Sequence, residues 1–203
     1  MMSDKKQALQ KLHLQLEQCG QCTLMTGPPV HGLAVDSSVM LIGQAPGFKE
    51  VEVLKPFAWT AGKKLFSWFE QIGMAETEVR QRITMSAICR CYPGKKAKQG
   101  DRVPTKEEIR QCSNWLQQEV NIIKPQLVIP VGKLAISQFM PVTTLAKVIG
   151  TKARAKVFEH PCDVISLPHP SGASTWYYTE PGKTLLQQAL KLIKQHSAWQ
   201  KLL

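Results

Sequence analysis

Cysteines are the side chains in this sequence whose spacing most directly indicates chemistry. They form a Cys-x-x-Cys pair, a Cys-x-Cys pair and two single residues: Cys19, Cys22, Cys89, Cys91, Cys112 and Cys162. In a reducing compartment, such cysteines bind a metal or cluster more often than they form disulfides. Four thiolates suit either tetrahedral zinc or an iron-sulfur cluster, and the spacing does not distinguish the two.

Two polar loops form a second group of candidate functional residues. Gly43–Gly47 follows the apolar run 39–42, and His169–Ser174 follows the apolar run 164–167. Short apolar runs of this kind are typical of buried strands. In a parallel sheet, ligands bind beyond the carboxyl ends of the strands, where both loops would lie. Either loop alone could be an ordinary turn, but the two together predict a pocket.

Strands alternate with helices along the chain, which predicts a three-layer α/β/α sandwich around a mainly parallel four-stranded sheet. The whole chain, 1–203, is expected to form a single domain. A capping box begins the helix after Thr105, where Glu108 can bond back to the cap, and residues 143–155 are interpreted as a basic surface loop. The expected strands are 39–42, 83–88, 127–131 and 164–167, and the expected helices are 5–18, 65–72, 105–120, 134–140 and 183–203.

The charge of the chain favours a polyanionic partner. Its 203 residues carry 26 Lys and Arg against 15 Asp and Glu, for a net charge of +11, which fits nucleic acid or an acidic membrane surface. No apolar run approaches the roughly 20 residues that a membrane helix needs, and the N-terminus lacks a signal-peptide core. We therefore expect a soluble, cytoplasmic protein. The loop 92–102 is rich in basic residues that are either solvated or contact a nucleic-acid backbone: Lys95, Lys96, Lys98 and Arg102.

Four motifs in a fixed order resemble those of the uracil-DNA glycosylase superfamily, within its iron-sulfur-containing families 4 and 5. They are the run Gly43–Glu50, the pair Pro56-Phe57, the run Arg102–Glu108 and the triplet His169-Pro170-Ser171. The resemblance covers about residues 19–193. It implies a monofunctional DNA repair enzyme that flips uracil, or a related deaminated base, out of DNA. The enzyme would hydrolyse the N-glycosidic bond and leave an abasic site.

The same resemblance implies roles for individual residues. His169 would stabilise the uracil anion at O2, an oxyanion-hole role, and Phe57 would stack on the flipped base, although it could instead be a core phenylalanine. Ser171 would hold a backbone phosphate. Further predicted contacts are Gln44 and Glu50 as catalytic residues, Gly43, Ala45 and Ser86 against the base, and Gly172, Lys95 and Lys96 against the DNA.

The sequence also departs from the family pattern. Ala45 replaces an Asp that activates water in the best-known branch, and Gln44 stands where family 4 commonly carries Glu. Either Glu50 activates the water, or cleavage is dissociative with a weakly assisted water. Ser86 is the plausible substitute for the Asn that reads uracil. These departures support an alternative function, a catalytically weak or inactive member that binds DNA or DNA damage.

For the cysteines, the resemblance implies a [4Fe-4S] cluster, with zinc as the runner-up. Its ligands would be Cys19, Cys22, Cys91 and Cys112. Counting back from the Tyr92-Pro93-Gly94 loop favours Cys91 as the third ligand, whereas counting forward from Ile83-Thr84 favours Cys89. Cys91 is preferred because the loop is the more distinctive feature. The expected partner is DNA that contains a deaminated base, with no membrane, and the expected state is a monomer.

Overall fold

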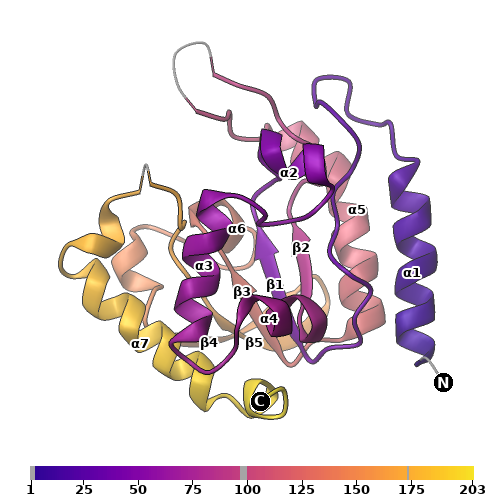
Figure 1. Cartoon of the computed structure of the whole chain (residues 1–203). Helices are drawn as coiled ribbons and strands as arrows, with labels where there is room; N and C mark the ends of the chain where they lie inside the picture. Colours follow the sequence, from indigo (N-terminus) through magenta and orange to yellow (C-terminus); the bar gives the residue numbers. More distant parts are fainter. Residues whose placement is uncertain (1–2, 97–99, 173) are drawn as a thin grey trace.

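A computed structural model describes residues 3–96, 100–172 and 174–203 of the chain. Its centre is a five-stranded sheet in the order β2-β1-β3-β5-β4 (Figure 1). The strands are β1 (Val39–Gly43), β2 (Thr84–Ala87), β3 (Leu127–Pro130), β4 (Lys152–Val157) and β5 (His160–Ile165). β1 pairs in parallel with β2 and β3, and β3 pairs in parallel with β5. The predicted α/β class and mainly parallel sheet are therefore confirmed.

The prediction of four strands was wrong, because β4 lies within the segment interpreted as a basic surface loop. β4 pairs antiparallel with β5 at the edge of the sheet. Its basic side chains, Lys152, Arg154 and Lys156, are exposed and alternate with the small residues Ala153 and Ala155. Charged side chains on an edge strand hinder pairing with another chain. Because the residues between these charges are small, the segment lacks the alternation of polar and large apolar residues by which a strand is predicted.

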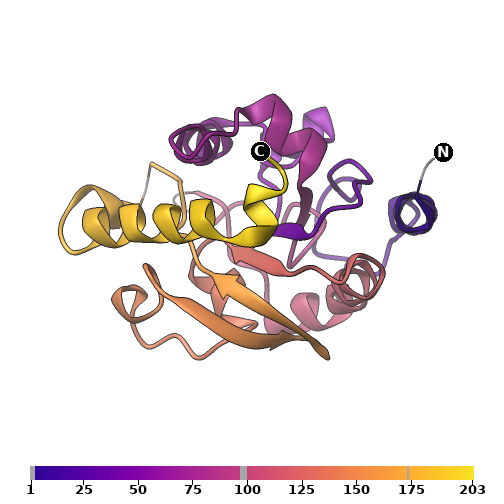
Figure 2. The ribbon, with the colours of Figure 1, turned by 90° about the horizontal axis from the view of Figure 1, so that it is seen from below.

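Helices cover both faces of the sheet (Figure 2). On one face, α3 (Thr60–Glu70), α4 (Glu76–Arg82), α7 (Gly182–Gln195) and α8 (Ser197–Gln200) enclose a core with Val39, Leu41 and Ile129. On the other face, α5 (Lys106–Ile123) and α6 (Lys133–Ser137) pack on Met40, Ile42, Val128 and Val164. Successive strand residues thus point to opposite faces, and the three layers that the sequence predicts are present.

Several helices differ in extent from the expected ranges. The predicted helix 183–203 is two helices, because the chain breaks at His196, whose ring accepts the Ala198 N–H at the start of α8. The unpredicted α2 (Phe48–Val53) follows the first polar loop, and two short 3-10 turns are η1 (Leu145–Lys147) and η2 (Trp176–Tyr178). As expected, Thr105 and Glu108 form the capping box of α5.

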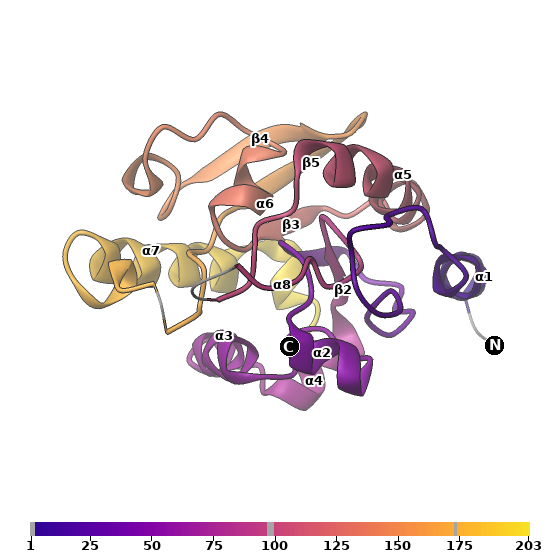
Figure 3. The same cartoon turned by 90° about the horizontal axis from the view of Figure 1, so that it is seen from above.

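The N-terminal helix α1 (Asp4–Glu17) lies outside the three layers and packs on α5 through Leu9, Leu12 and Ile123. Figure 3 shows the molecule from above, looking onto the carboxyl ends of the parallel strands. α2 and the loops that follow the strands lie at this end. No helix within the described ranges is long and apolar enough to cross a membrane.

Candidate active site

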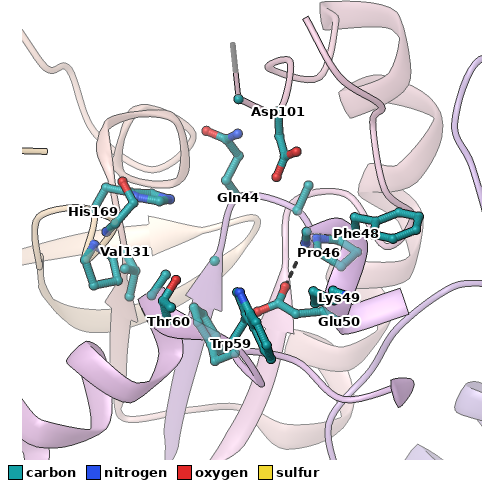
Figure 4. Close-up of a pocket in the computed structure, with 18 of the residues that line it drawn as sticks. Gln44, Pro46, Phe48, Lys49, Glu50, Trp59, Thr60, Asp101, Val131 and His169 are labelled. Atoms are coloured by element: carbon teal, nitrogen blue, oxygen red, sulfur yellow. Dashed lines mark hydrogen bonds between the residues drawn. The ribbon is translucent and has the colours of Figure 1, made fainter. Parts of the chain in front are cut away.

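A pocket of about 710 Å³ lies at the carboxyl edge of the sheet, between the two predicted loops (Figure 4). The first loop and the start of α2 form one wall, and the loop after β5 forms another. The lining comprises Gly43–Glu50, Phe57, 59–61, Pro93, Gly100, Asp101, Val131 and 169–171. The parallel strand order thus brings together residues more than 120 positions apart in sequence.

His169 turns its ring into this pocket (Figure 4). The Ser171 backbone N–H donates to His169 Nδ1 over 3.2 Å, so the neutral ring carries its proton on Nε2. Burial lowers the pKa of His169, which favours this neutral form. Gly132 packs against the ring: it has a φ of +87°, and a Cβ there would lie 3.0 Å from His169 Cδ2. Any larger residue would displace the ring.

The Phe57 ring lies against the backbone at the end of β1, with its Cζ nearest to Gly43. A Cβ on Gly43 would lie 2.8 Å from Phe57 Cζ, and a Cβ on Gly62 would lie 1.7 Å from the Phe57 carbonyl oxygen. Phe57 has a φ of +53°, in the left-handed region. The buried Arg80 holds this strained turn by donating to the carbonyls of Pro56 at 2.9 Å and Phe57 at 3.0 Å.

Glu50 lines the pocket, but its carboxylate is engaged at the start of α2. The Gly47 N–H donates to Glu50 Oε2 over 2.8 Å. Burial raises the pKa of Glu50, while hydrogen bonds from the backbone of Gly47, Ala58 and Phe57 oppose this shift. The carboxylate therefore braces the first loop and the turn that carries Phe57, and its freedom to act on a water molecule is limited.

Gln44 and Ala45 line the main pocket, whereas Ser86 does not. Ser86 is buried and donates its hydroxyl to Glu119 Oε2 over 2.7 Å. It borders only a side cavity of about 20 Å³, next to Gly43 and Phe57. The hydroxyl predicted to contact the base or water is therefore committed to a carboxylate inside the protein.

Of the residues predicted to contact DNA, one lines the pocket and the others that the structure describes are exposed near it in the chain. Ser171 lines the pocket, and Gly172 follows it as an exposed residue. Lys95 and Lys96 are exposed on the loop that leads to Gly100 and Asp101. Lys98, predicted with them, lies outside the described residues.

The four cysteines predicted as ligands line one small cavity of about 120 Å³ between the end of α1 and α5: Cys19, Cys22, Cys91 and Cys112. Burial and the neighbouring thiols Cys112, Cys19 and Cys22 raise the pKa of Cys91 to about 12. Such convergent thiols match the donor set of a bound cation, which would keep them ionised. As the side chains stand, no group of three or more His, Cys, Asp or Glu within the described ranges is arranged to hold a metal ion.

Cys89 and Cys162 are not among the residues that line this cavity. Both are fully buried in the core between the sheet and α5. Cys89 contacts Cys112 from the core side, and this hydrogen bond, together with burial, raises the pKa of Cys89. Cys91 is thus among the residues that line the cavity, and Cys89 adjoins the cavity through its contact with Cys112.

Sequence reasoning missed three residues that shape the site. Arg80 and Gly132 act through the loop carbonyls and the His169 ring, and nothing in their local sequence indicates this. Asp101 lines the pocket and accepts a 2.8 Å hydrogen bond from the Tyr92 hydroxyl. Its signal was available, because it directly precedes the motif Arg102–Glu108.

These observations define an α/β protein whose ligand site lies between two loops at the carboxyl edge of a parallel sheet. The chain belongs to the uracil DNA glycosylase superfamily, whose family model matches residues 29–194. This match confirms the family resemblance that the four ordered motifs indicate.

Curated relatives carry the name type-4 uracil-DNA glycosylase. The protein from Pyrobaculum aerophilum is 29% identical over 136 residues, which are 65% of this chain and 64% of that protein. The protein from Sulfurisphaera tokodaii is 24% identical over 197 residues, 93% of this chain and 84% of that protein. The protein from Saccharolobus solfataricus is 26% identical over 165 residues, 78% of this chain and 71% of that protein. The match to the first of these spans less than two thirds of that relative.

Proposed function

We propose that this chain is a uracil-DNA glycosylase of the type-4 branch, a monofunctional DNA repair hydrolase. It would take uracil, or a related deaminated base, out of DNA and hydrolyse the N-glycosidic bond to leave an abasic site. The observation that carries this proposal is the pairing of a half-buried, neutral His169 with the Phe57 ring in one pocket, each on its own loop. The superfamily match and the names of the relatives support it.

In this proposal the flipped base stacks on Phe57, where base–aromatic stacking contributes about 1–3 kcal/mol. His169 Nε2–H donates a hydrogen bond to uracil O2 as negative charge develops on the leaving base. A fixed donor in a site shielded from water stabilises such charge by about 3 kcal/mol. Because the ring is neutral and Nδ1 is occupied by the Ser171 N–H, the donor is oriented before the substrate binds.

The first loop would shape the space for the base and orient the groups that react. Gly43 leaves room for the Phe57 ring and, with Ala45, would border the base, and the Gln44 amide can orient the base or the attacking water. Glu50 holds the loop through the Gly47 N–H. Ser86 would then act indirectly, by fixing the strand β2 behind the pocket.

The surface around the pocket would bind the DNA backbone. Ser171 and the Gly172 backbone lie at the rim, and Lys95 and Lys96 extend the positive surface of a chain with net charge +11. Neutralising phosphates releases counterions, so binding would weaken steeply with salt. We further propose that the chain acts as a single domain, 1–203, and as a monomer in the cytoplasm, where its six cysteines would stay reduced.

His169→Ala tests the proposed function. We expect it to lower the single-turnover rate of uracil excision by about 100-fold, because one oxyanion-type donor is lost. The assay is a single-uracil oligonucleotide, treated with alkali to cut the strand at abasic sites. His160→Ala is the matched control, since His160 lies at the opposite end of β5 and bonds the Pro125 carbonyl. Equal rates for both variants would contradict the assignment.

For the cysteine cavity we propose a [4Fe-4S] cluster on Cys19, Cys22, Cys91 and Cys112, with zinc as the runner-up. When bound, the cluster would serve as a structural crosslink between the end of α1, the segment after β2 and α5. The convergence of four thiols on one cavity supports this donor set. The cluster would take no part in the bond-breaking step of the proposed hydrolysis.

Cys91→Ser tests the ligand set against the neighbouring cysteine. Anaerobically purified Cys91→Ser should lose iron, acid-labile sulfide and thermal stability together, because one of four ligands is removed. Cys89→Ser should keep full iron content, since Cys89 lies in the core and not in the cavity. The reverse result would assign Cys89 as the third ligand, and stoichiometric zinc without iron would favour the runner-up.

A further inference from the structure

Asp101 is a carboxylate in the main pocket that the roles above do not use. It stands with Gln44 and Pro46 around the same space (Figure 4). Its Oδ1 accepts a 2.8 Å hydrogen bond from the Tyr92 hydroxyl. Its Oδ2 lies on the side of Gly47, 3.4 Å from the position that a Gly47 Cβ would take. One oxygen is therefore held by the protein, and the other faces the first loop.

The backbone around Asp101 is fixed although the residue itself is exposed. Asp101 forms a β-bridge with Lys95, and the Arg102 N–H donates to the Gly94 carbonyl over 2.8 Å. Tyr92 is buried and packs edge-on against Phe48 at the start of α2. The hydroxyl that orients the carboxylate is thus part of the same rigid wall as the first loop, and such support is what a catalytic group requires.

Two carboxylates are present among the described residues that line this pocket, Glu50 and Asp101. Glu50 braces the Gly47 N–H and the turn at Phe57. Ala45 carries no acid. Asp101 is therefore the group best placed to act on a water molecule in the pocket.

The negative charge of Asp101 fits a catalytic role and does not fit a role in binding DNA. A carboxylate at the mouth of a pocket that receives DNA repels the phosphates, so it weakens affinity for the substrate. The same charge favours the positive sugar that develops when a glycosidic bond breaks. It can also accept a proton from the attacking water.

We propose that Asp101 is the general base of this site, a role that rests on the glycosylase function proposed above. The water oxygen forms a bond to C1′ of the deoxyribose, and the N1–C1′ bond breaks. The electron pair of that bond leaves with the base, where His169 Nε2–H bonds O2 of the anion. One water proton passes to Asp101 Oδ2 while Tyr92 holds Oδ1, and the base anion later takes up a proton from solvent.

Asp101→Asn tests this role while keeping the shape of the side chain and an acceptor for Tyr92. We expect the single-turnover excision rate to fall by about 100-fold, within the range for loss of a general base. Affinity for an oligonucleotide with a stable abasic-site analogue should stay equal or rise, because a repulsive charge is removed. The thermal midpoint should not change. A residue needed only to bind DNA would instead lose affinity.

Asp36→Asn is the control for the change in net charge. Asp36 is exposed and pairs only loosely with Lys5, at 3.8 Å. It precedes β1, at the opposite end of that strand from the first loop. Its variant should excise uracil at the wild-type rate. A loss of less than about 10-fold in Asp101→Asn, or a loss equal in Asp36→Asn, would overturn the proposal while leaving the glycosylase assignment intact. Wild-type protein that releases no base would overturn both.

Discussion

At the scale of single residues, the site depends on how each polar atom is already engaged. His169 Nδ1 is engaged by the Ser171 N–H, which leaves Nε2–H to donate. Glu50 Oε2 accepts the Gly47 N–H and the Ser86 hydroxyl donates to Glu119, so both side chains already have a hydrogen-bond partner inside the protein. Sequence motifs identify residue types at a pocket, but they do not show which hydrogen bonds a side chain already makes. The roles of Glu50 and Ser86 could therefore not be settled from the sequence.

The half-buried imidazole of His169 predicts how the stability of the chain depends on pH. Burial lowers the pKa of His169 in the folded chain below its ordinary value of 6.5. The unfolded chain then binds a proton first, so the free energy of unfolding falls as the pH drops below about 6.5. In His169→Gln this contribution is absent. Urea unfolding at about pH 7.5 and about pH 5.5 should show a larger loss of stability for wild type than for the variant. An equal loss in both proteins would show that His169 is not desolvated in solution.

At the scale of elements, most strands and helices follow directly from apolar periodicity and capping signals. β1, β2, β3 and α5, with its capping box at Thr105, were predicted within three residues at each end, whereas β5 begins four residues before the predicted run 164–167. The edge strand β4 was missed because one of its faces is solvated by Lys152, Arg154 and Lys156 and its inner residues are small. Short elements such as α2 gain their stability from tertiary contacts, which single-sequence reasoning does not supply.

A buried polar network joins three of these elements. Glu119 of α5 accepts hydrogen bonds from Ser86 of β2, from His13 of α1 and from both terminal nitrogens of Arg90. Burial alone would raise the pKa of Glu119, but the charge of Arg90 and the bonds from His13 and Arg90 lower it to about 2. Arg90 also lines the cysteine cavity. The network thus fixes α1 and the strand behind the pocket relative to the cysteines.

Glu119→Gln measures what this network contributes. The fully buried Arg90 would lose its counter-charge, and removing one partner of a buried ion pair costs about 3–5 kcal/mol. We expect a matching fall in the free energy of unfolding by urea. Glu107→Gln on the same helix is the control, because its pair with Arg110 is exposed, and it should unfold at the wild-type midpoint. Similar midpoints for the two variants would mean that Glu119 and Arg90 are not paired in solution.

At the scale of the whole molecule, the topology assembles the site from distant parts of the sequence. Parallel pairing of β1, β2, β3 and β5 sends the loops that follow β1 and β5 to one edge, together with the turn of Phe57 and the loop of Asp101. The cysteine cavity lies between the end of α1 and α5, and one of its lining residues, Cys91, precedes the loop that carries Lys95 and Lys96. A chain with a net charge of +11 thus carries a pocket of about 710 Å³ with a histidine donor at one edge of its sheet.

The most direct test of this account is the identity of the product released by the wild-type chain. The protein is incubated in excess with a single-uracil oligonucleotide, and both the small-molecule fraction and the strand are analysed by mass. We predict free uracil in the small-molecule fraction and an intact strand that carries one abasic site and breaks only on treatment with alkali. Tight binding of the oligonucleotide with no free base at any protein concentration would contradict the account and identify a protein that binds DNA without excising the base.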